Sequence, residues 1–334
     1  MTSPGAAPGL TVGEVGELGL LARLRPFLAV EGGELVTAAG DDAAVWQPAL
    51  GHAVVTTTDS LVEGIHFTLP LTATTAVDLG WRLLAVSLSD LAAMGAVAGP
   101  AFISLAVPAE WPVAWIEALY QGVAECGAQS AVAVAGGNIS ASPAAVLTSI
   151  CLGTVESHRV LRRAGSRAGD QLAVTGPVGT AAAVLRSGST GGAVPAEWAL
   201  SSRPAPRLDA GQQLARGGVC VATDISDGLF VDSGNLLAGA SCNGLLIDAG
   251  AIPVAAGVRE RWPREWLEIA GGGEDYELAF SAPAAVMQLA LRSLEASGLE
   301  PAVIGRFDDG HGLRVAADGE EAAPPASGHR HFGR

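Results

Sequence analysis

The sequence contains no lysine, so all 19 of its basic side chains are arginines. This absence excludes a phosphate-binding loop of the lysine type and any Schiff-base chemistry. Acidic side chains outnumber the basic ones, with 34 Asp and Glu and a net charge of −15, which argues against a nucleic-acid partner. Any phosphate that this chain binds must therefore be held by arginine, backbone N–H groups or metal ions.

Cysteines and long apolar runs are also scarce. The four cysteines, Cys126, Cys151, Cys220 and Cys242, lack the spacing of a metal site, so we expect free thiols in a reducing cytoplasm. Gly, Ser or Asp interrupts the longest apolar runs before they reach membrane-spanning length, and we expect no membrane segment. No basic stretch precedes an apolar core at the start, so we expect no secretory signal.

Alternating helix and strand patterns predict an α/β protein. The chain has 334 residues, of which 49% are hydrophobic, and is long enough for two domains. The patterns predict helices over 15–28, 78–96, 114–128 and 180–188, and strands over 52–60, 101–108, 131–138, 145–155 and 171–176. Because the pattern restarts after residue 157, we predict an N-terminal domain over 1–157 and a C-terminal domain over 158–334.

Carboxylates recur beside Gly, Ser or Thr, and several of them follow apolar strands. They are Asp41 and Asp42, Asp59 with Glu63, Asp90, Asp224 with Asp227, and Glu274 with Asp275. Hard cations such as Mg²⁺ prefer oxygen ligands and usually keep substrate phosphates in their shell. Without a cation, gathered carboxylates raise one another's pKa and destabilise the fold. Convergence of these loops would build a site for metal-bridged phosphates.

Each loop also has an ordinary structural interpretation. A turn would explain Asp41, and a helix cap would explain Asp227. Glu63 fits a solvated loop, and His66 fits a half-buried histidine. Asp90 is harder to explain in this way, because its predicted helix consists of small and apolar residues without an obvious solvated face. Taken together, five acid-bearing loops favour a functional site over five independent turns.

The motifs GDDAA, TTDSLVEGIHF, SDLAAMGA, TDISDGL and GGEDYEL occur in this order along the chain. With them the sequence resembles the thiamine-monophosphate kinase family over nearly its whole length, within the aminoimidazole ribonucleotide synthetase-like superfamily. The resemblance implies an α/β fold whose N-terminal domain contributes strands to a dimer barrel and whose C-terminal α/β domain completes an interdomain active site. It also implies a cytoplasmic homodimer that uses ATP, several Mg²⁺ ions and thiamine monophosphate.

The resemblance further implies roles for individual residues. Metal ions would be held by Asp41, Thr57, Thr58, Asp59, Asp90, Asn138, Asp224 and Asp227. ATP would contact Tyr120, Gly137, Asn138, Arg163 (or its neighbour Arg162) and Ser226. Thiamine phosphate would face His66, Asp275 and His329, with Phe332 as the alternative to His329 for stacking. The residues expected to act most directly in catalysis are Asp59, Asp224 and Asp227.

The implied reaction transfers the γ-phosphoryl group of ATP to thiamine monophosphate. Because the acceptor is already an anionic phosphate oxygen, no strong general base is needed. The site must instead offset the repulsion between two polyanions and align them, which metal ions and oriented backbone donors can do. The two aspartates of TDISDGL would serve metals at the donor and at the acceptor.

Two positions depart from the family pattern, and alternatives follow from them. Asn138 stands where the family has an aspartate, so one metal position would gain an amide oxygen but no charge. His329 stands where the family has an aromatic residue. One alternative is a protein that binds ATP or thiamine phosphate without turnover. Another is a metal-dependent phosphatase, which would release free phosphate and ignore ATP as a donor.

Three other activities of the superfamily fit the sequence less well. Selenophosphate synthetase would need a lysine and a reactive cysteine near the N-terminus, whereas the first cysteine is Cys126. A hydrogenase-maturation dehydratase would need a C-terminal cysteine, whereas this sequence ends in HFGR. Aminoimidazole ribonucleotide synthetase would be expected to have a lysine- and glycine-rich N-terminal segment.

Overall fold

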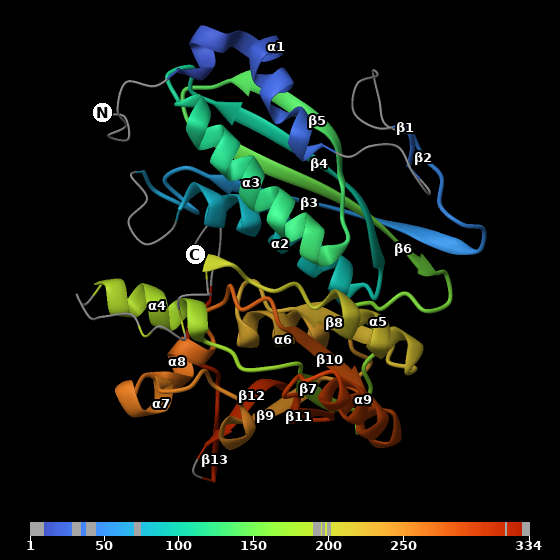
Figure 1. Ribbon diagram of the computed structural model, residues 1–334. Helices are drawn as coiled ribbons and strands as arrows, with labels where there is room; N and C mark the ends of the chain where they lie inside the picture. The colour runs from blue at the N-terminus through green and yellow to red at the C-terminus, as the bar shows by residue number, and fades with distance from the viewer. Residues whose placement is uncertain are drawn as a thin grey trace. The chain divides into compact units, whose positions relative to one another are not determined.

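The computed structural model describes residues 10–28, 35–37, 45–69, 75–189, 195, 198, 202–317 and 319–328. The chain forms two compact units, drawn in Figure 1: Met1–Leu91 with Val97–Val155, and Ala92–Ala96 with Glu156–Arg334. Each unit combines helices with a β-sheet, which confirms the predicted α/β class. Within the described residues, no helix combines the length and the apolar character needed to cross a membrane.

The first unit contains a four-stranded sheet with the order β3-β6-β4-β5 and a separate β1-β2 pair. In the larger sheet, β4 runs parallel to β5 and antiparallel to β6. The helices of this unit are α1 (Val12–Leu24), the short 3-10 helix η1 (Arg25–Phe27), α2 (Ala76–Ala93) and α3 (Val113–Ser130). The strands are β1 (Leu35–Thr37), β2 (Val45–Trp46), β3 (His52–Val62), β4 (Val97–Val107), β5 (Val134–Ala141) and β6 (Val146–Glu156).

Helices α2 and α3 approach each other through glycines. A Cβ on Gly80 would lie 1.8 Å from the carbonyl oxygen of Leu119, and a Cβ on Gly122 would lie 1.8 Å from that of Val77. Neither position has room for a side chain, so the two backbones pack directly against each other. Figure 1 shows α3 lying over the sheet, in roughly the same direction as β4 and β5.

The second unit is built on a seven-stranded sheet with the order β13-β12-β9-β11-β7-β10-β8. Its strands are β7 (Gln171–Val174), β8 (Val221–Asp224), β9 (Gly244–Asp248), β10 (Leu278–Ala282), β11 (Ala302–Asp308), β12 (Gly312–Ala317) and β13 (Glu320–Ala322). Its helices are α4 (Thr180–Ser189), α5 (Leu208–Arg216), α6 (Leu229–Ala238), η3 (Ala249–Ala251), α7 (Val258–Arg261), α8 (Trp266–Ala270) and α9 (Ala284–Ala296). One core packs α6 residues such as Phe230 and Leu236 against sheet residues such as Ile247.

The predicted boundaries of α3, β5 and α2 differ from the structure for local reasons. Helix α3 continues to Ser130 and ends at Ala131, whose left-handed φ of 55° lets its N–H donate to Gly127. Strand β5 consequently begins at Val134 instead of residue 131. Helix α2 ends at Ala93, before the predicted residue 96, because Gly95 adopts a φ of +70° that no helix continues through.

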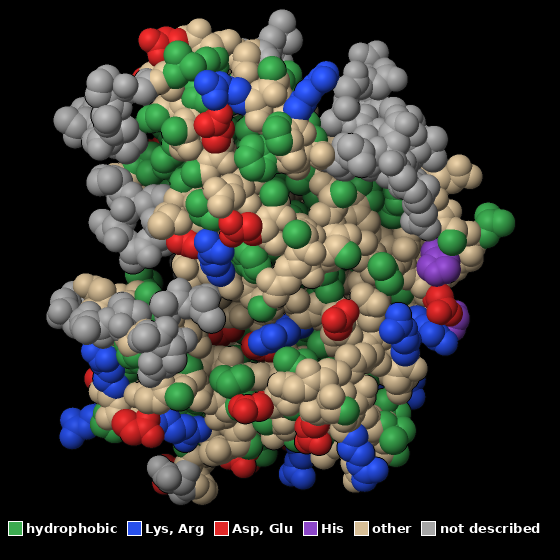
Figure 2. Space-filling view, viewed as in Figure 1, with side chains coloured by type: hydrophobic (Ala, Val, Ile, Leu, Met, Phe, Trp, Pro, Cys, Tyr) green, Lys and Arg blue, Asp and Glu red, His purple; other side chains and the backbone are tan. Residues whose placement is uncertain are grey.

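Charged side chains of both signs share the surface. On the face shown in Figure 2, arginine and carboxylate groups are interspersed.

Candidate functional site

A cluster of carboxylates and hydroxyls joins β3, α2 and β6 in the first unit. Thr57 on β3 donates its hydroxyl hydrogen bond to Asp90 on α2. Ser87, one turn before Asp90, donates to Asp59 on β3 over 3.1 Å and shares a 2.7 Å hydrogen bond with Ser149 on β6. The structure therefore brings Thr57, Asp59 and Asp90 to the same side of the sheet.

The alternation of β3 separates Thr58 from this cluster. Successive strand residues point to opposite faces, and the burial of β3 alternates accordingly, with Thr57 and Asp59 half-buried and Thr58 exposed. Thr58 therefore presents its side chain to the other face of the sheet. Its predicted role as a metal ligand stays a prediction.

The cluster offers only hard oxygen donors, which are the ligands that Mg²⁺ prefers. Asp59 and Asp90 each lie close enough to Cys151 for their negative charges to raise the pKa of its thiol, after the larger effects of burial and of Cys126. Among the described residues, no group of three or more His, Cys, Asp or Glu side chains is placed to hold a metal ion by itself. The donor set thus fits Mg²⁺ that also keeps water or phosphate oxygens in its shell.

Gly137 and Asn138 lie on β5, at one edge of the same sheet. A Cβ on Gly137 would lie 1.8 Å from the carbonyl oxygen of Ile103, so only glycine fits beside β4 at this position. Asn138 is exposed and pairs with Ser104 of β4. The predicted contacts of Gly137 and Asn138 with the nucleotide, and of Asn138 with a metal ion, stay predictions.

The remaining predicted residues of the first unit are held in place by local contacts. His66 follows β3, and its Nδ1 accepts a 3.0 Å hydrogen bond from the Val62 N–H, which leaves the proton on Nε2. Tyr120 on α3 is 3% exposed, and its ring centroid lies 6.2 Å from that of Phe27. Burial raises the pKa of the Tyr120 phenol, so this residue serves the core as an uncharged aromatic.

The TDISDGL motif forms the end of β8 and the loop into α6. Asp224 is the last residue of β8 and is 2% exposed. The loop then places the backbone N–H groups of Ser226, Asp227 and Gly228 around one oxygen of Asp232, at 3.1, 3.1 and 3.0 Å. Three consecutive N–H groups of the loop thus donate to the same carboxylate oxygen.

Sequence reasoning missed Asp232. It lies in the first turn of α6 and is 1% exposed, and burial raises its pKa to about 6 despite the hydrogen bonds from Gly228 and Asp227. One sequence feature could have identified Asp232: it is the only acid in the apolar segment LFVDSGNLLA that follows the TDISDGL motif. However, an aspartate near the N-terminus of a helix is usually explained by its favourable interaction with the helix dipole, so it gives no reason to expect a further role.

The TDISDGL loop is hydrogen-bonded to the GGGED loop through the backbone. The N–H of Glu274 donates to the carbonyl of Ser226 at 2.8 Å, and the N–H of Tyr276 donates to that of Ile225 at 2.9 Å. Gly273 makes this contact possible, because a Cβ there would lie 2.7 Å from the Ser226 carbonyl oxygen. Two motifs far apart in the sequence thus form one backbone unit.

Arg162 and Arg163 contact the chain around β8 in different ways, one through its backbone and the other through its side chain. The backbone of Arg162 bonds to Cys220 and Ala222 in a short bridge. The Nε of Arg163 donates to the hydroxyl of Thr223 at 3.1 Å, directly before Asp224. Of the two arginines, Arg163 is therefore the one whose side chain is seen to reach the aspartate loop.

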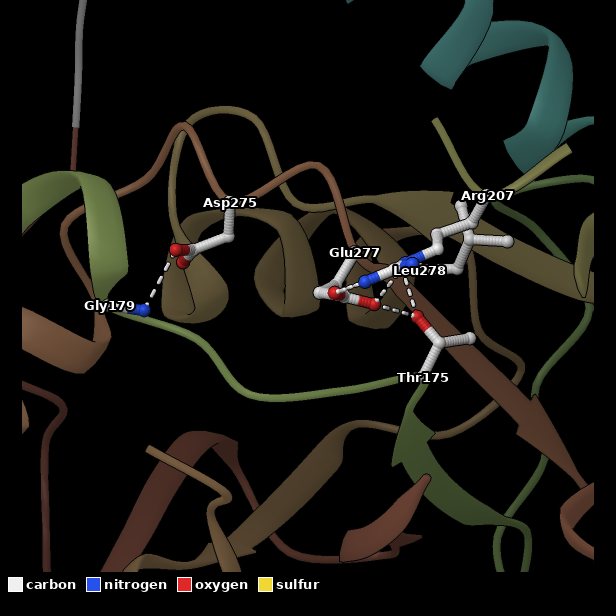
Figure 3. A network of polar contacts seen from close by, with 6 residues as sticks. All are labelled: Thr175, Gly179, Arg207, Asp275, Glu277 and Leu278. Carbon is white, nitrogen blue, oxygen red and sulfur yellow. Dashed lines mark hydrogen bonds and ion pairs between the residues drawn. The ribbon is translucent and has the colours of Figure 1, made fainter. Parts of the chain in front are cut away.

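Asp275 points toward Gly179, as Figure 3 shows. Its Oδ1 accepts a 2.8 Å hydrogen bond from the N–H of Gly179, just before α4. Asp275 is a half-buried residue, and the burial of its carboxyl raises the pKa of this group well above its usual range. The neighbouring Glu274 is exposed. The predicted contact between Asp275 and thiamine phosphate stays a prediction, but the contact that the structure gives this side chain is structural.

A second network in Figure 3 supports the same loop. Glu277, 4% exposed, accepts hydrogen bonds from both Arg207 and Thr175, the latter at 2.6 Å. The Thr175 hydroxyl in turn accepts from the Leu278 N–H at 2.8 Å. The Glu277 carbonyl also accepts from Ile225 at 2.8 Å, so this network fixes the start of the aspartate loop.

Three predicted positions lie outside the described residues. They are Asp41, His329 and the alternative stacking residue Phe332. Their roles stay predictions.

Family models match both parts of the chain. The model of the AIR synthase related protein, N-terminal domain, matches residues 40–155, and that of the corresponding C-terminal domain matches residues 167–318. The thiamine-monophosphate kinase of Synechococcus elongatus is 34% identical over 317 residues, which cover 90% of this chain and 90% of the relative.

Solved structures give the same result. The crystal structure of thiamine-monophosphate kinase from Stenotrophomonas maltophilia K279a has a TM-score of 0.81 and 35% identity, over 91% of this chain and 96% of that one. A structure of AaThiL complexed with AMPPCP and TMP has a TM-score of 0.73 and 27% identity, over 98% of this chain and 100% of that one. The predicted two-domain AIR synthase-like fold is confirmed.

Proposed function

The chain belongs to the thiamine-monophosphate kinase family, and we propose that it transfers the γ-phosphoryl group of ATP to thiamine monophosphate, with thiamine diphosphate and ADP as products. The bond between the β,γ-bridging oxygen of ATP and the γ-phosphorus breaks, and a bond from an acceptor phosphate oxygen to that phosphorus forms. The acceptor oxygen is already anionic, so the chain needs to position two phosphates and supplies no strong base.

The observation that carries the proposal is the oxygen cluster of Thr57, Asp59 and Asp90. Carboxylates repel phosphates, so they can serve a phosphoryl transfer only through cations. Mg²⁺ bound there would neutralise charge on the transferring group. The chain's own part is orientation: Ser87 holds the Asp59 carboxylate at 3.1 Å and Thr57 holds that of Asp90. We propose both aspartates as Mg²⁺ ligands, together with Asp41, Thr57 and Asn138. Thr58 points its side chain to the other face of the sheet, so it could join this set only through its backbone carbonyl.

The aspartate loop of the second unit supplies the other part of the proposed machinery. Asp224 and Asp227 are proposed as further Mg²⁺ ligands, and Ser226 and Arg163 as contacts for ATP. Two contacts support the role of Arg163: its Nε bonds to Thr223, and, against the larger effect of burial, its positive charge lowers the pKa of Asp232, the carboxylate that holds the loop. An arginine fits phosphate through paired N–H groups, which is consistent with a chain that has no lysine.

We also propose that the protein is a homodimer that associates through the four-stranded sheet of the first unit. Ser60 and Thr148 share a 2.8 Å hydrogen bond on the face opposite the Asp59 cluster. Ile150 and Phe102, which are paired across β6 and β4, are only half-buried there, and Val54 is 51% exposed. A face with an exposed valine and half-buried isoleucine and phenylalanine suits contact with a second copy. Light scattering of the wild-type protein and of Ile150→Arg tests it: a dimer is expected, and a monomer for the variant.

The test of activity separates the kinase from its alternatives. Purified protein is incubated with ATP, Mg²⁺ and thiamine monophosphate, and the products are separated by chromatography. The proposal predicts thiamine diphosphate in equal amount to ADP, and none without Mg²⁺. Free phosphate and thiamine would indicate a phosphatase, and ATP–Mg²⁺ binding without any product would indicate a binding protein.

A further inference from the structure

We propose that Asp232 is the positioning residue of the Ser226–Gly228 loop. Its carboxylate fixes the backbone of this loop, so that the side chains of Ser226 and Asp227 are presented in one orientation to the phosphates and their metals. This inference rests on the proposed kinase function for its consequence in catalysis, but the contacts that support it belong to the fold.

The geometry of the carboxylate is specific to the loop. A single oxygen, Oδ2, accepts from three consecutive N–H groups at 3.0 to 3.1 Å, while Oδ1 receives only a long contact of 3.4 Å from Asn235. Three donors on one oxygen hold three successive peptide planes at once. Such a set leaves the loop backbone little freedom to rotate.

The position of the loop explains why it needs this support. Gly228 precedes α6 with a φ of +132°, so the chain turns sharply after Asp227. Apart from this carboxylate, the backbone bonds of the loop lie at its two ends, from the Glu274 N–H to the Ser226 carbonyl and from the Asp232 N–H to the Gly228 carbonyl. Asp232 lies inside, 1% exposed, and therefore acts on the phosphates only through the loop.

Three variants test this role. Asp232→Asn keeps an oxygen that can accept the same N–H groups, and Asp232→Ala removes the acceptor. Leu236→Ala is the matched control, because Leu236 is fully buried on the same helix and contributes to the core. We expect Asp232→Ala to lower kcat/KM and to raise the half-saturating Mg²⁺ concentration, each at least about tenfold. Asp232→Asn should stay within about threefold of the wild type.

Leu236→Ala should lower the melting temperature without moving the Mg²⁺ dependence. A helix cap or a packing residue would behave in this way, whereas a positioning residue would not. Equal Mg²⁺ dependence in the wild type and Asp232→Ala would overturn the proposal. So would an Asp232→Asn variant as impaired as Asp232→Ala.

Hydrogen exchange gives a readout that does not depend on activity. In the full-length protein, the amides of Ser226, Asp227 and Gly228 should exchange slowly in the wild type and in Asp232→Asn, and at least about tenfold faster in Asp232→Ala. If the wild type makes no thiamine diphosphate, the proposed function fails, and the exchange alone then decides the positioning role. Unchanged exchange in Asp232→Ala would overturn it.

Discussion

The backbone N–H of Glu274 donates a 2.8 Å hydrogen bond to the carbonyl of Ser226 and so joins the two motifs of the second unit. Gly273, directly before Glu274, approaches the same carbonyl closely enough that a Cβ would lie 2.7 Å from it. The orientation of Ser226 and Asp227 therefore depends on a glycine in the other motif.

Replacing Gly273 with alanine should displace the aspartate loop and lower kcat/KM by at least about tenfold, a loss of the size expected when one good hydrogen bond is broken. Gly298→Ala is the control, because Gly298 has a similar φ of +83° but open space around it. Both variants bear the strain of a side chain at positive φ, about 1 kcal/mol or more. Steady-state kinetics and urea unfolding of both variants test this, and equal activity would contradict it.

Removal of one carboxylate from the first cluster should raise the requirement for Mg²⁺. We expect Asp59→Asn and Asp90→Asn each to raise the half-saturating Mg²⁺ concentration by at least about tenfold, because an amide oxygen brings no charge to the ion. Asp209→Asn, on the exposed side of α5, is the control. Activity measured over a Mg²⁺ titration decides, and responses that match Asp209→Asn would show that the cluster holds no catalytic ion.

Asn138 allows the converse experiment. Asn138→Asp adds a charge at an exposed position of β5 and should lower the half-saturating Mg²⁺ concentration if this residue is a ligand. Exposed Ser140, two residues along the same strand, gives the control variant Ser140→Asp. A similar change in both variants would indicate a general effect of surface charge.

Asp275 has a structural contact that an amide can replace. Asp275→Asn should keep the hydrogen bond from Gly179 and leave the KM for thiamine monophosphate within about threefold, whereas Asp275→Ala should lower the melting temperature. Kinetics and thermal unfolding of both variants test this. A large rise in KM for Asp275→Asn would instead support the substrate contact predicted from the sequence.

The Arg207–Glu277 pair should contribute measurably to stability. Arg207→Met leaves the Glu277 carboxylate buried without its cation and should lower the free energy of unfolding by about 3 kcal/mol. Arg159→Met, in the more exposed Arg159–Glu156 pair, should change it by about 0.5 kcal/mol or less. Urea denaturation measures both, and recovery in Arg207→Met with Glu277→Gln would assign the loss to the uncompensated charge.

The sequence by itself determined the class of protein and most of its chemistry. The absence of lysine and the acid-bearing loops predicted a site for phosphates bridged by metals, and the motifs resembled those of a kinase family. The alternating patterns predicted an α/β fold in two parts. These features are local, because a strand end, a turn or an acid beside glycine can be read from neighbouring residues.

Only the tertiary structure decided which side chains face the same way. The opposite faces of Thr57 and Thr58 follow once 52–62 is a strand, but the pairing of Thr57 with Asp90 needs α2 on that face. The hydrogen bond of Asp275 depends on Gly179 in another segment, and those of Asp232 depend on the conformation of the preceding loop. A carboxylate points to the donors that the fold places around it, and no spacing in the sequence records where those donors lie.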